Sequence, residues 1–141
     1  MMNAVEMARR ELVPLDRDQC LRLLASVPVG RLIFTVNALP AVRVMNFALV
    51  GDVIVVRTAA GTAAARKAPG SIVAFEADHV DAASSSGWSV TVTGRAAHVT
   101  DPDAVARYSS LPLMPWAPGA RDEFLTIRAE VVEGQQIVIP D

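Results

Sequence analysis

The fold is decided by one stretch of the chain, Val53-Ile-Val-Val-Arg57-Thr58-Ala-Ala-Gly61-Thr62-Ala-Ala-Ala-Arg66-Lys67-Ala68. Its four leading β-branched aliphatic residues predict a buried strand. Arg57 and Thr58 end that run, and Gly61-Thr62 opens an alanine-rich segment that favours a helix. The first N–H groups of such a helix lack intrahelical partners, so with Arg57 and the two threonine hydroxyls they can hold an anion such as a phosphate. The alternative is a plain strand-to-helix connection with solvated polar residues.

Closely spaced strands are predicted on both sides of this stretch. They cover Arg31–Val36, Ala41–Val50, Val53–Thr58, Ser71–Asp78, Trp88–Val99 and Glu123–Ile139, the last as a pair or one long bent strand with Gly134 as a turn or bulge. Asn37 to Pro40 is the expected turn between the first two strands. Short strands linked by hairpins, with small helices inserted, are typical of an antiparallel barrel, so we expect a mainly β (α+β) fold. Strands and helices do not alternate regularly, which argues against a doubly wound parallel sheet.

Three small peripheral helices are expected beside the barrel. The first begins after Asp16, a suitable N-cap, and ends before Pro28 and Gly30. The second is the alanine-rich run after Thr62. The third begins at Asp101-Pro102 and continues to about Tyr108.

The predicted strand from Trp88 alternates strictly between apolar residues and Ser, Thr or Arg, which indicates one buried and one polar face. Trp88 follows a flexible Ser-rich loop, and Trp116 lies in a segment rich in proline. Both indoles can plug a barrel end or a subunit interface. Alternatively, they wall in a flat heterocycle.

Composition sets the broad class. A chain of 141 residues corresponds to one domain, with residues 14–141 as the folded unit and residues 1–13 as a flexible lead-in. The hydrophobic fraction of 52% exceeds what one small core can hide, which indicates a subunit interface. A net charge of −2 without blocks of like charge gives no sign of a nucleic-acid or membrane partner. The lone Cys20 and the lack of a signal-peptide pattern favour a cytoplasmic location.

Familiar catalytic patterns are missing. His79 and His98 are the only histidines, and they lack the spaced ligands of a metal site, although Asp78 and Asp81 flank the first. No Gly-x-Ser-x-Gly elbow or Walker A sequence is present, and Cys20 has no evident activating partner. We therefore name no catalytic residue and expect no metal.

Five motifs in register nevertheless resemble a known family. They are Val-Gly30-Arg31-Leu, Val55-Val-Arg57-Thr58-x-x-Gly61-Thr62, Ala74-Phe75-Glu76-Ala-Asp78, Gly87-Trp88-Ser89-Val90-x-Val92-x-Gly94-Arg95-Ala96 and Pro115-Trp116-Ala-Pro118-Gly119. Together they span about Leu15 to Ile139 and resemble the pyridoxamine 5'-phosphate oxidase-like split-barrel flavoproteins.

The resemblance implies a homodimer of six-stranded split β-barrels that binds one FMN in each of two clefts at the interface. It implies an oxidoreductase that reduces a flavin or a small substrate, with NAD(P)H as the expected electron donor. The implied FMN-binding residues border the ring, line the phosphate or close the pocket: Val44, Met45 and Asn46; Arg57, Thr58, Gly61 and Thr62; and Trp88, Ser89 and Trp116.

One departure from the family pattern concerns the phosphate. Members commonly carry a lysine directly after the Gly-Thr pair, where this chain has Ala63. A charge-assisted contact of roughly 1.5–3 kcal/mol is lost with that lysine. Arg66 or Lys67, one helical turn later, is a candidate to compensate, and Arg43 is another. Two alternatives therefore stay open: a non-catalytic protein that binds or senses a flavin or haem, and a barrel dimer that has lost its cofactor.

Overall fold

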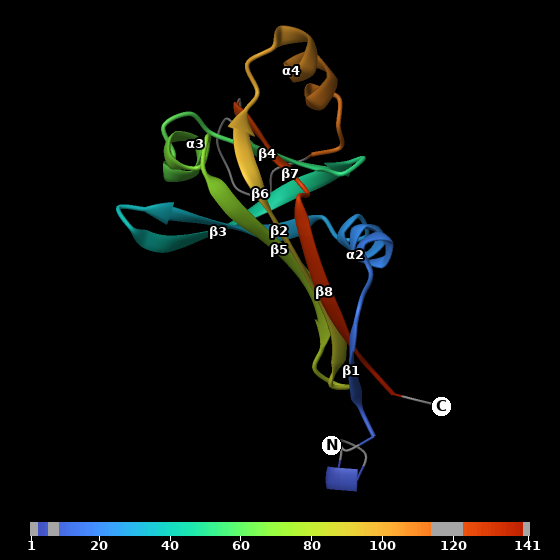
Figure 1. Cartoon of the computed structure of the whole chain (residues 1–141). Coiled ribbons are helices and arrows are strands. Elements are labelled where there is room, and N and C mark those ends of the chain that lie inside the picture. Colours follow the sequence, from blue (N-terminus) through green and yellow to red (C-terminus); the bar gives the residue numbers. More distant parts are fainter. Residues whose placement is uncertain (1–2, 6–8, 114–122, 140–141) are drawn as a thin grey trace.

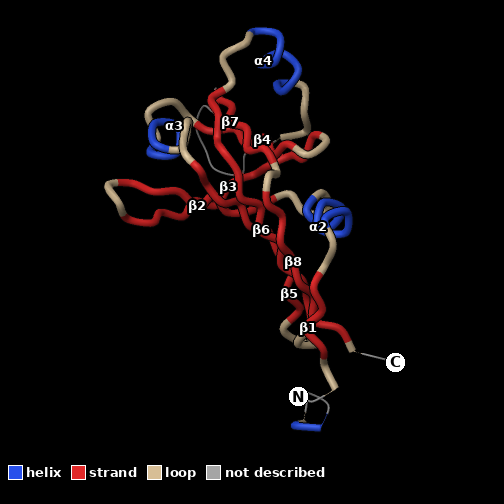
Figure 2. The backbone as a smooth tube through the Cα atoms, viewed as in Figure 1, coloured by secondary structure: helices blue, strands red, loops and turns tan. Residues whose placement is uncertain are grey.

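The computed structural model of the chain describes residues 3–5, 9–113 and 123–139. Within them, the strands are β1 (Glu11–Pro14), β2 (Val29–Val36), β3 (Leu39–Val50), β4 (Val53–Thr58), β5 (Ile72–Asp81), β6 (Ser86–His98), β7 (Glu123–Arg128) and β8 (Val131–Val138). The helices are α2 (Arg17–Leu24), α3 (Ala63–Lys67) and α4 (Pro102–Ser109). Strands dominate, and these helices lie at the periphery (Figure 2).

Six antiparallel strands close into a barrel, as predicted. The order runs β6-β5-β2-β3-β4-β7, and additional pairing of β6 with β7 closes the ring. The long strand β6 takes part in two sheets, because Ala96–His98 pair with β7 whereas Gly87–Thr93 pair with β8. Strand β1 pairs with the far side of β8, so the β5–β6 hairpin, β8 and β1 extend away from the barrel (Figure 1).

The hairpins explain the register of the first strands. Asn37 and Ala38 both have positive φ, 51° and 66°, which suits a two-residue turn between antiparallel strands. The expected four-residue turn to Pro40 is therefore wrong, since Leu39 and Pro40 already pair with Val36 and Thr35. Pro40 is tolerated there because it stands beyond the part of β3 that pairs with β4.

Alternating residues of the strands fill the barrel. Phe47 and Phe75 meet with ring centroids 4.8 Å apart. On β6, Val90 and Val92 are fully buried, whereas Thr91 and Thr93 between them are partly exposed. The predicted alternation of this strand is confirmed.

Helix α2 begins with a capping box, in which Asp16 accepts from the Gln19 N–H and the Gln19 side chain accepts from the Asp16 N–H. The helix packs on β8 at Gly134, where a Cβ would lie 2.5 Å from Cys20 Sγ. Gly134 is thus the contact point of a helix and not the expected turn or bulge; the chain turns earlier, between Arg128 and Val131.

Candidate functional site

The connection from β4 to α3 forms a tight corner, and we call Arg57–Thr62 the β4–α3 corner. Thr62 is the N-cap of α3: its hydroxyl accepts from the Ala65 N–H at 3.2 Å and donates to the Ala59 carbonyl at 2.9 Å. The hydroxyl oxygens of Thr58 and Thr62 are 3.1 Å apart. Gly61 has φ +84°, a conformation that favours glycine. The predicted strand–turn–helix arrangement is confirmed.

Charge at this corner comes from side chains more than from the helix. Because α3 has only five residues, its dipole is short. Arg57 lies on the outside of the barrel, with its guanidinium carbon 5.2 Å from the centroid of the Phe124 ring. This cation–π contact orients the cation beside the corner. Arg66 is exposed on α3, whereas Thr58 faces inward and is only 5% exposed.

Strand β3 brings two of the predicted residues to the same outer surface. Phe47 pairs with Val56, and both face the core. Continuing that register by one residue sets Asn46 beside Arg57 on the outside, with Val44 two residues further along. Met45 faces the other way and packs against the core. The structure thus groups Val44, Asn46 and Arg57 on one surface.

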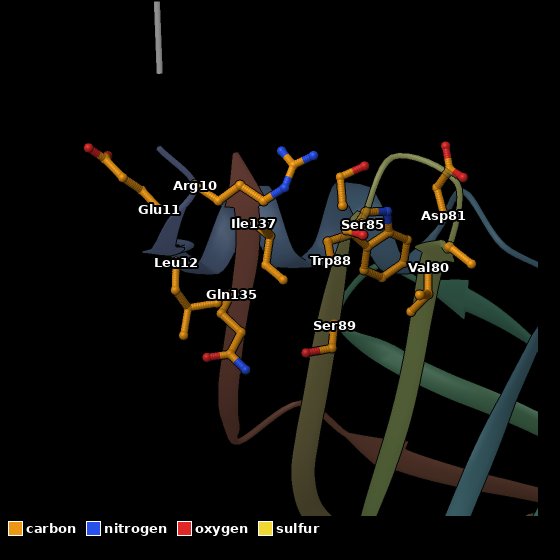
Figure 3. A pocket seen from close by; sticks show the side chains of 13 residues that line it. Arg10, Glu11, Leu12, Val80, Asp81, Ser85, Trp88, Ser89, Gln135 and Ile137 are labelled. Atoms are coloured by element: carbon orange, nitrogen blue, oxygen red, sulfur yellow. The ribbon is translucent and has the colours of Figure 1, made fainter. Parts of the chain in front are cut away.

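Trp88 and Ser89 lie at a second place, an open pocket of ≈ 750 Å³ near the tip of the β5–β6 hairpin (Figure 3). Trp88 is 9% exposed and Ser89 is partly exposed. The pocket is lined by Arg10, Glu11, Leu12, Val80, Asp81, Ala82, Ser85, Ser86, Gly87, Trp88, Ser89, Gln135 and Ile137. The sequence did not predict that residues of β1 and β8 line this pocket, because their position depends on pairing between segments far apart in the chain.

Helix α3, which follows the corner, lies near the start of β5, and the β5–β6 hairpin that carries this pocket lies at its other end (Figure 1). Only the four residues 68–71 separate the end of α3 from Ile72, at the start of β5. Trp88 pairs with His79, seven residues further along that strand, a length of about 23 Å. The predicted indole-flanked slot and phosphate corner are therefore not adjacent within a single chain. Trp116 lies outside the described residues.

A charged cluster that the sequence analysis missed lies on the outer face of the sheet. Arg31 of β2 contacts two carboxylates of β5, Asp78 at 3.1 Å and Glu76 at 3.5 Å. Glu76 Oε1 is buried and makes no hydrogen bond. Burial, followed by the hydrogen bond and charge of Asp78, raises the pKa of Glu76 to about 7, and Arg31 opposes this rise. The i, i+2 spacing of Glu76 and Asp78 on a strand was the available signal, but Arg31 joins them only through the β2–β5 register.

Exposed apolar side chains surround this cluster. The strand registers place them on the same outer face, and we call them the outer-face patch: Leu12, Val42, Val44, Ile72, Val80, Val131 and Ile137. Their exposed fractions run from 38% for Ile137 to 71% for Val80. So many exposed apolar side chains on one face of a sheet favour association of that face with another chain.

Neither a metal cluster nor a membrane-spanning helix occurs in the described part of the chain. It contains no group of three or more His, Cys, Asp or Glu side chains able to hold a metal ion. None of the helices described there is both long enough and apolar enough to cross a membrane.

Comparison with known proteins decides the family. Residues 16–137 match the family model described as pyridoxamine 5'-phosphate oxidase. The chain belongs to this family. The resemblance seen in the sequence motifs is thereby confirmed.

The chain is also similar to a curated relative and to solved structures. An uncharacterised protein of Mycobacterium tuberculosis is 47% identical over 134 residues, covering 92% of this chain and 88% of the relative. The structure of the FAD-binding protein from Mycobacterium smegmatis is 27% identical, with a TM-score of 0.71 over 89% of this chain and 98% of the other. A conserved protein of unknown function from Corynebacterium diphtheriae is 30% identical, with a TM-score of 0.76 over 90% and 98% of the two chains.

Proposed function

We propose that this protein is a homodimeric flavin-dependent oxidoreductase that binds FMN at the β4–α3 corner and reduces a small substrate or a free flavin. The observation that carries the proposal is the grouping of Val44, Asn46 and Arg57 on one outer surface beside the Thr58–Thr62 turn. The FAD-binding relative from Mycobacterium smegmatis supports a flavin as the ligand.

The chemistry of these side chains fits a flavin nucleotide. Arg57 supplies a fixed positive charge and several N–H donors for the phosphate, and Arg66 adds a second cation from α3. Asn46 carries both a donor and an acceptor, which suits the polar edge of the ring, and Val44 gives an apolar contact for its flat face. Thr62 serves the phosphate indirectly, because its hydroxyl already holds the turn through Ala59 and Ala65.

A second copy of the chain completes the pocket in this proposal. One chain places Trp88 and Ser89 far from its own corner, so their contact with the same flavin requires a neighbouring chain. The outer-face patch lies between the two places and offers the apolar area that such an interface needs. We therefore propose that the hairpin of one copy lies against the corner of the other.

The bound flavin supplies hydride and electron transfer, and the chain anchors, orients and shields it. No acid or base is assigned. NAD(P)H is the proposed electron donor, and a small electrophile or a free flavin is the proposed acceptor. The cytosol is the proposed location, which agrees with a single buried thiol, Cys20.

The experiment is a titration of the purified protein with FMN, followed by absorbance and by quenching of flavin fluorescence. We expect saturable binding and anaerobic bleaching of the flavin bands by NADH or NADPH. Binding without bleaching by either donor supports a non-catalytic carrier or sensor instead. A protein that neither carries a flavin nor quenches the fluorescence of added FMN contradicts the proposal. That result favours a barrel that has lost its cofactor, which agrees with Ala63 in place of the lysine common in the family.

A further inference from the structure

The Arg31–Glu76–Asp78 cluster lies on the outer face of the sheet, within the surface proposed above for association. Arg31 pairs with Val44 on one side and with Glu76 on the other. The side chains of the cluster are partly exposed in the single chain, at 42% for Arg31, 23% for Glu76 and 28% for Asp78. Docking of another chain on this face would remove much of the remaining solvent.

The charges of the cluster do not cancel. One guanidinium faces two carboxylates, which leaves a net charge of −1 when both acids are ionised. Glu76 pairs with Thr91 of β6, and Thr91 pairs on its other side with Glu133 of β8. The next ionisable residue in this direction is therefore another acid. The nearest further cation on the outer side of β6 is Arg95, four residues from Thr91, where it donates to the Gly70 carbonyl. Strand β3 contributes only the apolar Val44. Among the described residues that pair next to the cluster on these strands, Arg31 is thus the only cation beside the two acids.

We propose that association of two copies through the outer face takes up a proton at Glu76, so that the dimer is tighter at acidic than at alkaline pH. This inference rests on the proposed homodimer. Enclosing an uncompensated charge in apolar surroundings is costly, and protonation removes it. A protonated Glu76 donates a hydrogen bond to Asp78, while Asp78 keeps its ion pair with Arg31 at 3.1 Å.

The direction of the effect follows from the titration of the single chain. Burial and Asp78 raise the pKa of Glu76 to about 7, so Glu76 is mostly protonated at pH 6 and mostly ionised at pH 8. Further burial in a dimer raises this pKa again. If Glu76 stays protonated in the dimer, the dissociation constant rises about tenfold per protomer between pH 6 and pH 8, hence about 100-fold in all.

The test is sedimentation of fluorescently labelled protein, as purified, over a dilution series at pH 6 and pH 8 and constant ionic strength. For a dimer that does not dissociate at the lowest concentration, the rate of subunit exchange replaces the dissociation constant, and faster exchange is expected at pH 8. Glu76→Gln should remove the pH dependence and leave the dimer as tight at pH 8 as the wild type is at pH 6. Circular dichroism of this near-isosteric variant confirms that it folds.

Glu133→Gln is the matched control, because Glu133 lies on the same face but two strands away, and it should keep the pH dependence of the wild type. A dimer whose stability is equal at both pH values, or is greater at pH 8, overturns the proton uptake and leaves the homodimer standing. The same pH dependence in Glu76→Gln also overturns it. A protein that is monomeric throughout refutes the homodimer itself.

Discussion

Replacing Arg57 by alanine tests the phosphate-binding role of the β4–α3 corner. The substitution removes the cation beside the corner and its contact with Phe124, 5.2 Å away. A charge-assisted hydrogen bond contributes roughly 1.5–3 kcal/mol, which corresponds to about 10- to 150-fold weaker FMN binding. Loss of the cation–π contact costs about 0.5–1 kcal/mol of folding stability at such a partly exposed position, so the barrel should stay folded.

The assay compares FMN with riboflavin, which has the same ring and no phosphate, by quenching of flavin fluorescence. Arg57→Ala should weaken FMN binding and leave riboflavin binding nearly unchanged. Arg128→Ala is the matched control, because Arg128 is an exposed arginine that pairs with Val53 at the other end of β4; its FMN affinity should equal that of the wild type. Equal losses for both ligands, or an unchanged FMN affinity, would refute the assigned role.

Further substitutions test the corner and the packing around it. Ala63→Lys restores the residue common in the family and should tighten FMN binding by roughly tenfold, measured by the same titration; an unchanged affinity means that the phosphate lies elsewhere. Thr62→Ala removes the N-cap of α3 and should lower the free energy of unfolding in urea by about 0.5–2 kcal/mol, whereas Thr62→Ser should retain it; equal losses in both variants contradict the capping role. Gly134→Ala forces a Cβ to within 2.5 Å of Cys20 Sγ and should cost about 1–3 kcal/mol in urea unfolding. Adding Cys20→Ala should recover part of that cost, and a purely additive double variant would show that the two residues do not interact.

Local patterns predicted most of the barrel because its strands are rich in β-branched residues, several alternate in polarity, and turn residues bound them. Asp16 and Asp101 cap their helices as expected, and Thr62 caps α3 at the start of the predicted helical run, since capping needs only neighbouring residues. The strand–turn–helix form of the β4–α3 corner was also readable, because the whole motif is contiguous in the chain.

Features that depend on contacts between segments far apart in the chain could not be predicted from the sequence. Strand β1 exists because β8 offers it an edge, and its own four residues carry little β signal. Gly134 was expected to turn the chain, but its role follows from the close packing of Cys20 of helix α2 against β8.

In the candidate site too, residues close together in the sequence could be grouped by prediction, whereas residues brought together by strand pairing could not. Arg57 and Thr62 could be grouped from their spacing, whereas the separation of Trp88 from them required the strand registers. The Arg31–Glu76–Asp78 cluster joins residues more than forty positions apart, so only the β2–β5 pairing reveals it. All of the roles assigned in binding FMN stay predictions: those of Val44, Met45, Asn46, Arg57, Thr58, Gly61, Thr62, Arg66, Trp88, Ser89 and Trp116.

Native mass spectrometry of the protein after incubation with FMN tests the account most directly, because it reads assembly and ligand count together. We predict a dimer that carries two FMN molecules, with the ligand absent from any monomer. A monomer that retains FMN, or a dimer that retains none, would contradict a flavin site built from two copies of this chain.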